Sequence, residues 1–336
     1  EVTVQNPTYN GKEQSPKVTV TLGEKTLTPN TDFNVTARMQ TNAGSYKLTI
    51  SGNGNYTGEI EKDWKIEPMK IELVKFNKNL SKVYDGSAVF DLTSAAKENC
   101  VLFYGPNMQV ISVPAEAYDV SNVRFVAKDA ENNYVESPEV GSKAIAFTVT
   151  LKSENYVLQA SDVDKPASEL TYTQSGGATF TITKETAPAQ TTEVTLHVTN
   201  DLAKTYEVDL AALLPKLTMP CEYGDISYTV NADGLNKDYY TNGATVESGK
   251  LRLPILANNV DTEGSIGNVT VTVTTTNYED ITLTIPVFAR NKLTPDQTGV
   301  TVSASDITYG DSLAKSKLTV TGTMKDPNTG AEVKGT

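Results

Sequence analysis

Histidine, cysteine and tryptophan are scarce in this 336-residue chain, which contains one, two and one of them respectively. A structural zinc site usually needs several histidine or cysteine ligands, and the single histidine, His197, cannot supply them. Triad catalysis would also depend on His197, which has no nucleophile motif near it. We therefore expect no catalytic, metal-binding or cofactor-binding residues and no cofactor, and we expect His197 to face outward on a strand.

The two cysteines, Cys100 and Cys221, fall in different predicted modules. A disulfide inside one β-sandwich needs both partners in that sandwich. The sequence therefore predicts two free thiols. Such low cysteine usage is compatible with export in an organism that does not rely on disulfides.

Long apolar runs and an excess of basic residues are also missing. No window approaches the roughly 18–20 apolar residues that a membrane span needs, so no membrane insertion is expected. The chain has 29 Lys and Arg against 41 Asp and Glu, a net charge of −12. Without a basic stripe to neutralise phosphates, a nucleic-acid partner is disfavoured. A charge of this size suits a soluble, self-repelling monomer.

The clearest positive pattern is a predicted hairpin over residues 41–68. Its first strand alternates apolar and polar residues with the period of two of a half-buried strand, and Gly and Asn at 52–55 allow the chain to reverse. Trp64 shares the apolar face of the returning strand, which favours a core position over a sugar-binding platform. The expected inward residues are Tyr46, Leu48, Ile50, Ile60, Trp64 and Ile66.

A glycine, a run of β-formers and then Asn-Tyr recur at residues 44–55, 141–155 and 267–277. Each predicted module also has a tyrosine beside a glycine and an Asn or Asp. We expect the ring of this tyrosine to cover one end of a β-sandwich while its hydroxyl reaches a backbone group. These tyrosines are Tyr9, Tyr84, Tyr223 and Tyr309.

These repeats predict an all-β fold of tandem Ig-like β-sandwich modules in an extended string. Strand-like runs end near Pro68, Pro188 and Pro295, because proline cannot donate to a β-ladder. Only residues 91–99 and 209–217 are compatible with short helices. The predicted modules are residues 1–68, 69–188, 189–295 and 296–336, the last of them partial.

Several of these motifs resemble known bacterial repeats. TYNGKEQSP at 8–16 and GNGNYTGEIEKDWKI at 52–66 resemble the Ig-like repeats of large Gram-positive surface proteins. KVYDGS at 82–87 resembles the YDG repeat, and ITYGDSLAKSKLTVTG at 307–322 resembles the MBG-type repeat of bacterial adhesins. The resemblance implies an extracellular protein, cell-wall attached at the cell surface or secreted, with no catalytic residues to carry over. Related modules sometimes carry a Lys–Asn isopeptide bond, and none is expected here.

The resulting hypothesis is a non-enzymatic fragment of a repeat protein that acts as a stalk or adhesion spacer. The chain begins at EVTVQNP without Met or signal peptide and ends at VKGT without an evident anchor, so we expect an excerpt of a longer secreted protein. Host glycans, matrix proteins or cell-wall polysaccharide are the partners considered. The alternative is a carbohydrate-binding module array attached to an extracellular enzyme, and an enzyme hidden in open loops is a third interpretation.

Two weaker signals remain. Asp162-Val163-Asp164 offers carboxylates for calcium, but a solvated loop explains a lone DxD better. Short Thr-rich β sequences also generate N-x-S/T sequons by chance, so the four present here carry little weight. They lie at Asn34, Asn55, Asn79 and Asn268.

Overall fold

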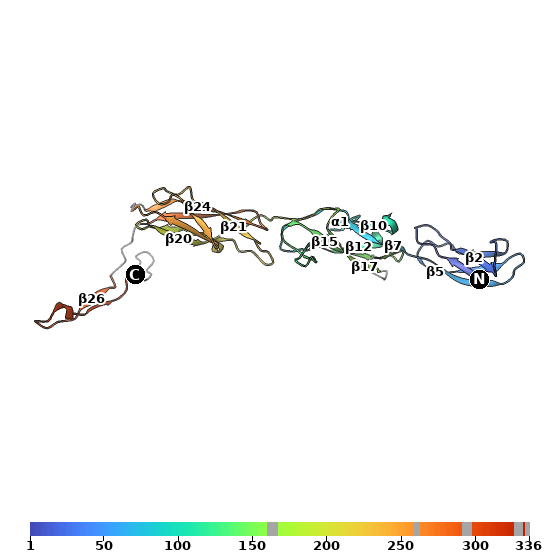
Figure 1. Cartoon of the computed structure of the whole chain (residues 1–336), viewed down its shortest axis with the longest axis horizontal. Helices are drawn as coiled ribbons and strands as arrows, with labels where there is room; N and C mark the ends of the chain where they lie inside the picture. Colours follow the sequence, from blue (N-terminus) through green and yellow to red (C-terminus); the bar gives the residue numbers. More distant parts are fainter. Residues whose placement is uncertain (160–166, 259–262, 291–297, 326–331, 333–336) are drawn as a thin grey trace. The chain divides into compact units, whose positions relative to one another are not determined.

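The architecture is almost entirely β (Figure 1). A computed structural model describes residues 1–159, 167–258, 263–290, 298–325 and 332. The α-helix of this described part, α1 (Ser94–Lys97), is one turn long and is capped by the Thr93 hydroxyl. The predicted all-β class of tandem Ig-like β-sandwiches is confirmed.

The chain packs as two compact units. Unit 1 contains residues 1–186 together with two short segments from later in the chain, and unit 2 contains the remainder. The two later segments of unit 1 are Leu217–Asp225 and Thr275–Glu279.

The first sandwich of unit 1 has two three-stranded antiparallel sheets. Trp64 is 2% exposed and its ring centroid lies 5.1 Å from that of Tyr46, so the predicted core position is confirmed. Ile60 shares the face of Trp64 but is 43% exposed, because it lies near the start of the edge strand. The strands are β1 (Val2–Gln5), β2 (Lys17–Leu22), β3 (Lys25–Thr26), β4 (Phe33–Ala37), β5 (Gly44–Gly52) and β6 (Glu59–Ile66).

The second sandwich is built around a four-stranded sheet in the order β13-β12-β15-β17. Strand β15 does not alternate as its sequence predicts, because Ala144, Ala146 and Thr148 are buried along with its larger residues. Val126, opposite Ala144 on the neighbouring strand β12, packs with the two alanines, and the Thr148 hydroxyl lies 3.0 Å from that of Thr171. The strands are β7 (Met69–Ile71), β8 (Leu73–Phe76), β9 (Leu80–Val83), β10 (Val101–Tyr104), β11 (Val110–Ile111), β12 (Tyr118–Lys128), β13 (Tyr134–Glu136), β14 (Gly141–Ser142), β15 (Ala144–Leu151), β16 (Tyr156–Leu158), β17 (Glu169–Gln174) and β18 (Phe180–Thr183).

The third sandwich pairs a β19-β25-β24-β21 sheet with a β20-β23-β22 sheet. Apolar residues alternate into its core along β23, β24 and β25, as the period of two predicts. A 3-10 turn at Ala211–Leu213 lies within the predicted helical segment 209–217. The strands are β19 (Leu196–Val198), β20 (Lys204–Asp209), β21 (Ile226–Asn231), β22 (Thr245–Glu247), β23 (Lys250–Ile255), β24 (Gly264–Thr275) and β25 (Ile281–Ala289).

A single hairpin of β26 (Thr301–Ala304) and β27 (Leu318–Thr321) follows, with all of its residues exposed. Tyr309 is fully exposed beside it, so the prediction that this tyrosine covers a sandwich end is wrong. The physical reason is that two strands alone present no packed end for a ring to cover.

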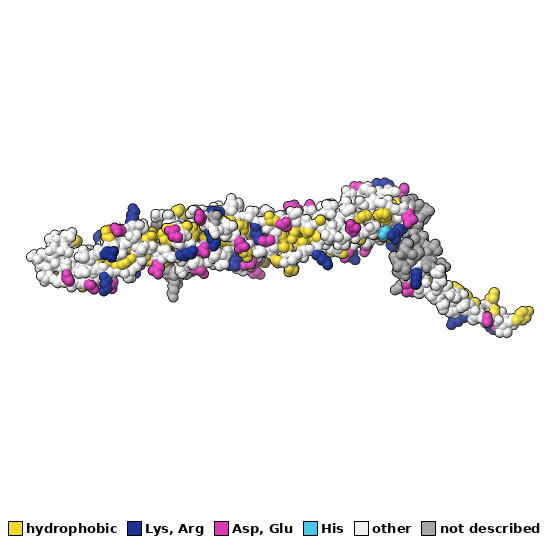
Figure 2. Space-filling view, turned by 180° about the vertical axis from the view of Figure 1, so that it is seen from behind, with side chains coloured by type: hydrophobic (Ala, Val, Ile, Leu, Met, Phe, Trp, Pro, Cys, Tyr) yellow, Lys and Arg dark blue, Asp and Glu magenta, His cyan; other side chains and the backbone are white. Residues whose placement is uncertain are grey.

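The surface mixes charges of both signs. On the face drawn in Figure 2, Asp and Glu side chains are interspersed with Lys and Arg side chains. Within the described part of the chain, no helix is long and apolar enough to cross a membrane.

Candidate functional site

Two Tyr-Asx-Gly turns, Tyr9-Asn10-Gly11 and Tyr84-Asp85-Gly86, have the same local structure. In each, the Asx carboxamide or carboxylate oxygen accepts the backbone N–H two residues later, at 2.9 Å. The glycines have φ values of 76° and 75°, which favour glycine over residues with a Cβ. Asx and Gly together therefore fix the turn that carries the tyrosine.

Each of these turns is tied to the last strand segment of its own sandwich. The Tyr9 N–H donates to the Glu67 carbonyl at 2.8 Å, just after β6. The Tyr84 N–H donates to the carbonyl of Thr183, the last residue of β18, at 2.9 Å. Both tyrosines thus lie where the chain leaves one sandwich for the next.

The Asn-Tyr dipeptides recognised in the sequence supply the partners of these tyrosines. Within unit 1, the Tyr156 ring meets the Tyr9 ring edge-on, at 5.3 Å between centroids and 77° between planes. The Tyr278 ring meets the Tyr84 ring in the same way, at 5.6 Å and 78°. Edge-to-face pairs of this kind add to the stabilisation from burial alone.

The asparagines of the two Asn-Tyr dipeptides also make equivalent hydrogen bonds. The Asn155 side-chain oxygen accepts the Ala43 N–H at 2.7 Å, and that of Asn277 accepts the Val140 N–H at 3.1 Å. Each donor directly precedes the glycine of the repeated motif, Gly44 or Gly141. The motif glycine and the motif Asn-Tyr therefore mark opposite sides of a contact.

Two backbone N–H groups bond to the carbonyls of these asparagines, one from the first residue of β7 and one from the residues that follow β18. The Met69 N–H donates to the Asn155 carbonyl at 2.9 Å, and the Glu185 N–H donates to the Asn277 carbonyl at 3.1 Å. We call these two contact sets the first joint and the second joint; all their residues belong to unit 1. The first joint comprises Tyr9, Ala43, Met69, Asn155 and Tyr156, and the second comprises Tyr84, Val140, Glu185, Asn277 and Tyr278.

The second joint contains further contacts from the segment Leu217–Asp225. The Tyr84 hydroxyl accepts the Glu222 N–H at 2.9 Å, and the Asn277 side-chain nitrogen donates to the Glu222 carbonyl at 3.1 Å. The Tyr223 ring also packs against Tyr278, at 5.4 Å between centroids. The predicted hydroxyl-to-backbone contact is therefore present at Tyr84.

Burial raises the pKa of two of the joint phenols, Tyr156 and Tyr278. It raises the pKa of Tyr156 to about 12, and the neighbouring Tyr9 adds to the shift. It also raises the pKa of Tyr278 well above the ordinary value of tyrosine, with a hydrogen bond involving Cys221 as the next cause. Cys100 is buried, Cys221 is half-buried, and both are free thiols.

The expected equivalence of Tyr223 with Tyr9 and Tyr84 is wrong. Tyr84 follows β9, which runs parallel to the last strand β18, and in the third sandwich β19 pairs with β25 in the same way. The residue that follows β19 is Thr199. Tyr223 instead packs against Tyr278. The Tyr and Gly residues that Tyr223-Gly224 shares with the other motifs therefore did not indicate an equivalent position in the sandwich.

A third Asn-Tyr dipeptide, Asn55-Tyr56, takes part in neither joint. Asn55 is exposed, and no side-chain hydrogen bond of Asn55 is present among the described residues. The Tyr56 hydroxyl accepts a hydrogen bond from the Lys25 ammonium at 3.4 Å. The dipeptide therefore offers a matched comparison for the two joints.

The other candidate residues do not assemble into a site in the described part. His197 is exposed on β19, as predicted, 3.2 Å from the Arg290 guanidinium, and partial desolvation together with this cation lowers its pKa. Asp162-Val163-Asp164 lies outside the described residues. Among the residues that are described, no three His, Cys, Asp or Glu side chains are grouped to hold a metal ion.

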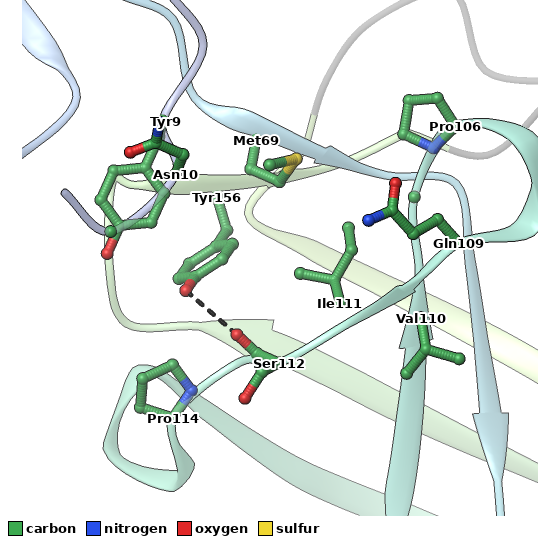
Figure 3. A pocket seen from close by; sticks show the side chains of 12 residues that line it. Tyr9, Asn10, Met69, Pro106, Gln109, Val110, Ile111, Ser112, Pro114 and Tyr156 are labelled. Atoms are coloured by element: carbon green, nitrogen blue, oxygen red, sulfur yellow. Dashed lines mark hydrogen bonds between the residues drawn. The ribbon is translucent and has the colours of Figure 1, made fainter. Parts of the chain in front are cut away.

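A cavity of about 480 Å³ lies beside the first joint (Figure 3). Tyr9, Met69 and Tyr156 line one part of it, and the segment 105–114 of the second sandwich lines another. The Tyr156 hydroxyl points toward the Ser112 carbonyl, at 3.5 Å. Nothing in the sequence pattern indicated this cavity, because it depends on contacts between residues far apart in the chain.

No known family model matches the sequence, and no curated protein matches it. Among solved structures, the chain is similar to the EC1-3 fragment of mouse clustered PcdhgC3, with 12% identity over 74% of this chain and 77% of that one and a TM-score of 0.30. It is also similar to the human desmocollin-1 ectodomain, with 11% identity over 92% of this chain and 63% of that one and a TM-score of 0.22. Titin domains z1z2, in complex with telethonin, give 12% identity, 87% and 98% coverage and a TM-score of 0.22.

Proposed function

We propose that the chain is a non-enzymatic stalk or adhesion-spacer segment of an extracellular repeat protein. The observation that carries this proposal is the recurrence of one joint: a tyrosine pair, an asparagine that accepts an N–H across the contact, and a second backbone N–H on the asparagine carbonyl. Sandwiches joined by a linker alone are expected to move relative to one another. A dedicated contact set restrains that motion, which is what a spacer needs.

The modules proposed for this spacer are residues 1–68, 69–188, 189–295 and 296–336. Pairing between the named strands occurs within these ranges, which supports the division. The YDG-like and MBG-like motifs support a bacterial setting, cell-wall attached or secreted. Glycans, matrix proteins or cell-wall polysaccharide remain the proposed partners, and a monomer the proposed state.

Small-angle X-ray scattering of the full chain tests the spacer proposal. We expect a long maximum dimension for the unmodified chain and a broader distribution of distances for the double variant Asn155→Ala/Asn277→Ala. Asn55→Ala is the matched control and should leave the profile unchanged, because Asn55 takes part in neither joint. A compact profile for the unmodified chain, or an unchanged profile for the double variant, would overturn the proposal.

The carbohydrate-binding alternative is favoured by one observation, the tyrosine-lined cavity beside the first joint. This alternative needs a ligand site, whereas the spacer needs only the joints. The two functions are therefore separable, since a spacer can also present a binding site.

A further inference from the structure

The cavity beside the first joint has the dimensions of a small-ligand site. Its volume of about 480 Å³ falls within the roughly 300–1,000 Å³ that is typical of ligand pockets. All of its lining residues belong to unit 1, so the site is built within one compact unit. The segment 105–114 forms a wall opposite Met69 and Tyr156 (Figure 3).

The lining is uncharged, although the chain carries 41 acidic and 29 basic residues. Apolar surface comes from Met69, Ile111 and the tyrosine rings, while Gln109 contributes a side-chain amide. Figure 3 shows this amide directed toward Met69 and Ile111. Gln109 makes no side-chain hydrogen bond within the part of the chain that the structure describes, so its donors and acceptor are open to a ligand.

An unusual backbone turn lies between two lining residues of the cavity, Pro106 and Gln109. Asn107 and Met108 are consecutive non-glycine residues with φ of 61° and 60°, in the left-handed region. Each such residue costs of the order of 1 kcal/mol or more, and strain of this kind is concentrated at binding sites. The Met108 and Val110 side chains beside it are 55% and 58% exposed. The segment thus keeps a strained turn and exposed apolar groups at the rim of an uncharged cavity.

We infer that this cavity binds a neutral sugar, as one to three pyranose units of an oligosaccharide. An anionic ligand would find no Lys or Arg in the lining, and a cationic ligand would find no carboxylate. A hydrocarbon would bury the Gln109 amide without a partner, which is costly. A pyranose ring offers a C–H face for the tyrosine and proline surfaces and hydroxyl groups for the amide.

This site goes beyond the spacer role and does not depend on it. The ligand would contact Tyr9 of the first sandwich on one side of the first joint, and Met69 and Tyr156 of the second sandwich on the other. Binding should therefore reduce the motion of the first joint, because the ligand holds both sides together. The second joint should not respond.

The experiment measures binding of the full 336-residue chain to neutral oligosaccharides of two to four glucose, mannose, galactose or N-acetylglucosamine units. Sulfated and uronate-containing glycans serve as charged comparators. The tightest ligand is then titrated by calorimetry against the unmodified chain, Gln109→Ala and Gln5→Ala. Both glutamines are exposed, so neither variant should disturb folding, but only Gln109 lines the cavity.

We expect a neutral oligosaccharide to bind, with affinity reduced at least tenfold in Gln109→Ala and unchanged in Gln5→Ala. Amide resonances of Ile111 and Tyr156 should shift on binding, while that of Tyr278 should not. The inference is overturned if no neutral glycan binds at millimolar concentration or if only charged glycans bind. It is equally overturned if Gln109→Ala binds as well as the unmodified chain, since the ligand would then lie elsewhere.

Discussion

The two joints use the same contacts but differ in how closely they are surrounded. In the second joint, Asn277 is 2% exposed, and the segment Leu217–Asp225 adds Tyr223 and a Glu222 backbone contact. In the first joint, Asn155 is only half-buried, and Tyr9 and Tyr156 line a cavity. The motif therefore determines which groups pair, and the neighbouring loops determine whether the joint is closed or open to a ligand.

Removing the tyrosine rings should give the largest difference between the joints. Tyr278→Ala should lower the free energy of unfolding of unit 1 by about 3–5 kcal/mol, because its ring packs against both Tyr84 and Tyr223. Tyr156→Ala should cost about 2 kcal/mol, since one side of its ring already faces a cavity. Scanning calorimetry measures both changes. A larger loss for Tyr156→Ala would contradict the comparison of a closed and an open joint.

Removing the asparagine side chains should give a smaller effect in the same order. Asn277→Ala removes two hydrogen bonds at a buried position and should cost about 1–3 kcal/mol. Asn155→Ala also removes two, to Ala43 and Asn42, but water can replace them, so about 0.5–1.5 kcal/mol is expected. Denaturant titration of each variant provides the values. Asn55→Ala should change stability by no more than about 0.5 kcal/mol, as an ordinary surface substitution does.

Alkaline pH should weaken the first joint by a small amount, comparable to that of Asn155→Ala. The folded pKa of Tyr156, about 12, lies above the unfolded value near 10, so its stabilisation is complete below pH 10 and is lost as the pH rises toward 12. By pH 10.5 the loss from this group should be about 1 kcal/mol. Tyr156→Phe should remove that part of the pH dependence in thermal melts between pH 9 and 10.5. An identical pH dependence in the variant would show that Tyr156 is not a buried neutral phenol.

The alternation of apolar and polar residues in the sequence correctly predicted which side chains of β24 are buried. It failed for β15, in which side chains on both faces of the strand are buried. Val269, Val271 and Val273 point into the core because β24 has one buried and one partly open face. The alternation of β15 failed because Ala144 and Ala146 pack with Val126 of the neighbouring strand β12 and are buried on the face expected to be open. The alternation along a strand predicts toward which face of the sheet each side chain points. Whether the face expected to be open is also buried depends on the tertiary fold.

The sequence predicted the motifs that form the joints but not which motifs pair with each other. The Tyr-Asx-Gly turns and the Asn-Tyr dipeptides were recognised as repeats because each carries local turn chemistry. That Tyr9 pairs with Tyr156, rather than with the Tyr56 of its own sandwich, could not be read from spacing, since the partner lies in the next sandwich. Tyr223 and Tyr309 were grouped with Tyr9 by their neighbouring letters alone, and the structure places them elsewhere.

Hydrogen exchange at two backbone amides tests the joint most directly. The Ala43 and Val140 N–H groups donate to the side-chain oxygens of Asn155 and Asn277, so both should be protected in the unmodified chain. Residue-resolved exchange by NMR should show faster exchange of Ala43 alone in Asn155→Ala, and of Val140 alone in Asn277→Ala. Asn55→Ala should affect neither amide. Fast exchange of both amides in the unmodified chain would contradict the hydrogen bonds to Asn155 and Asn277 on which the two joints depend.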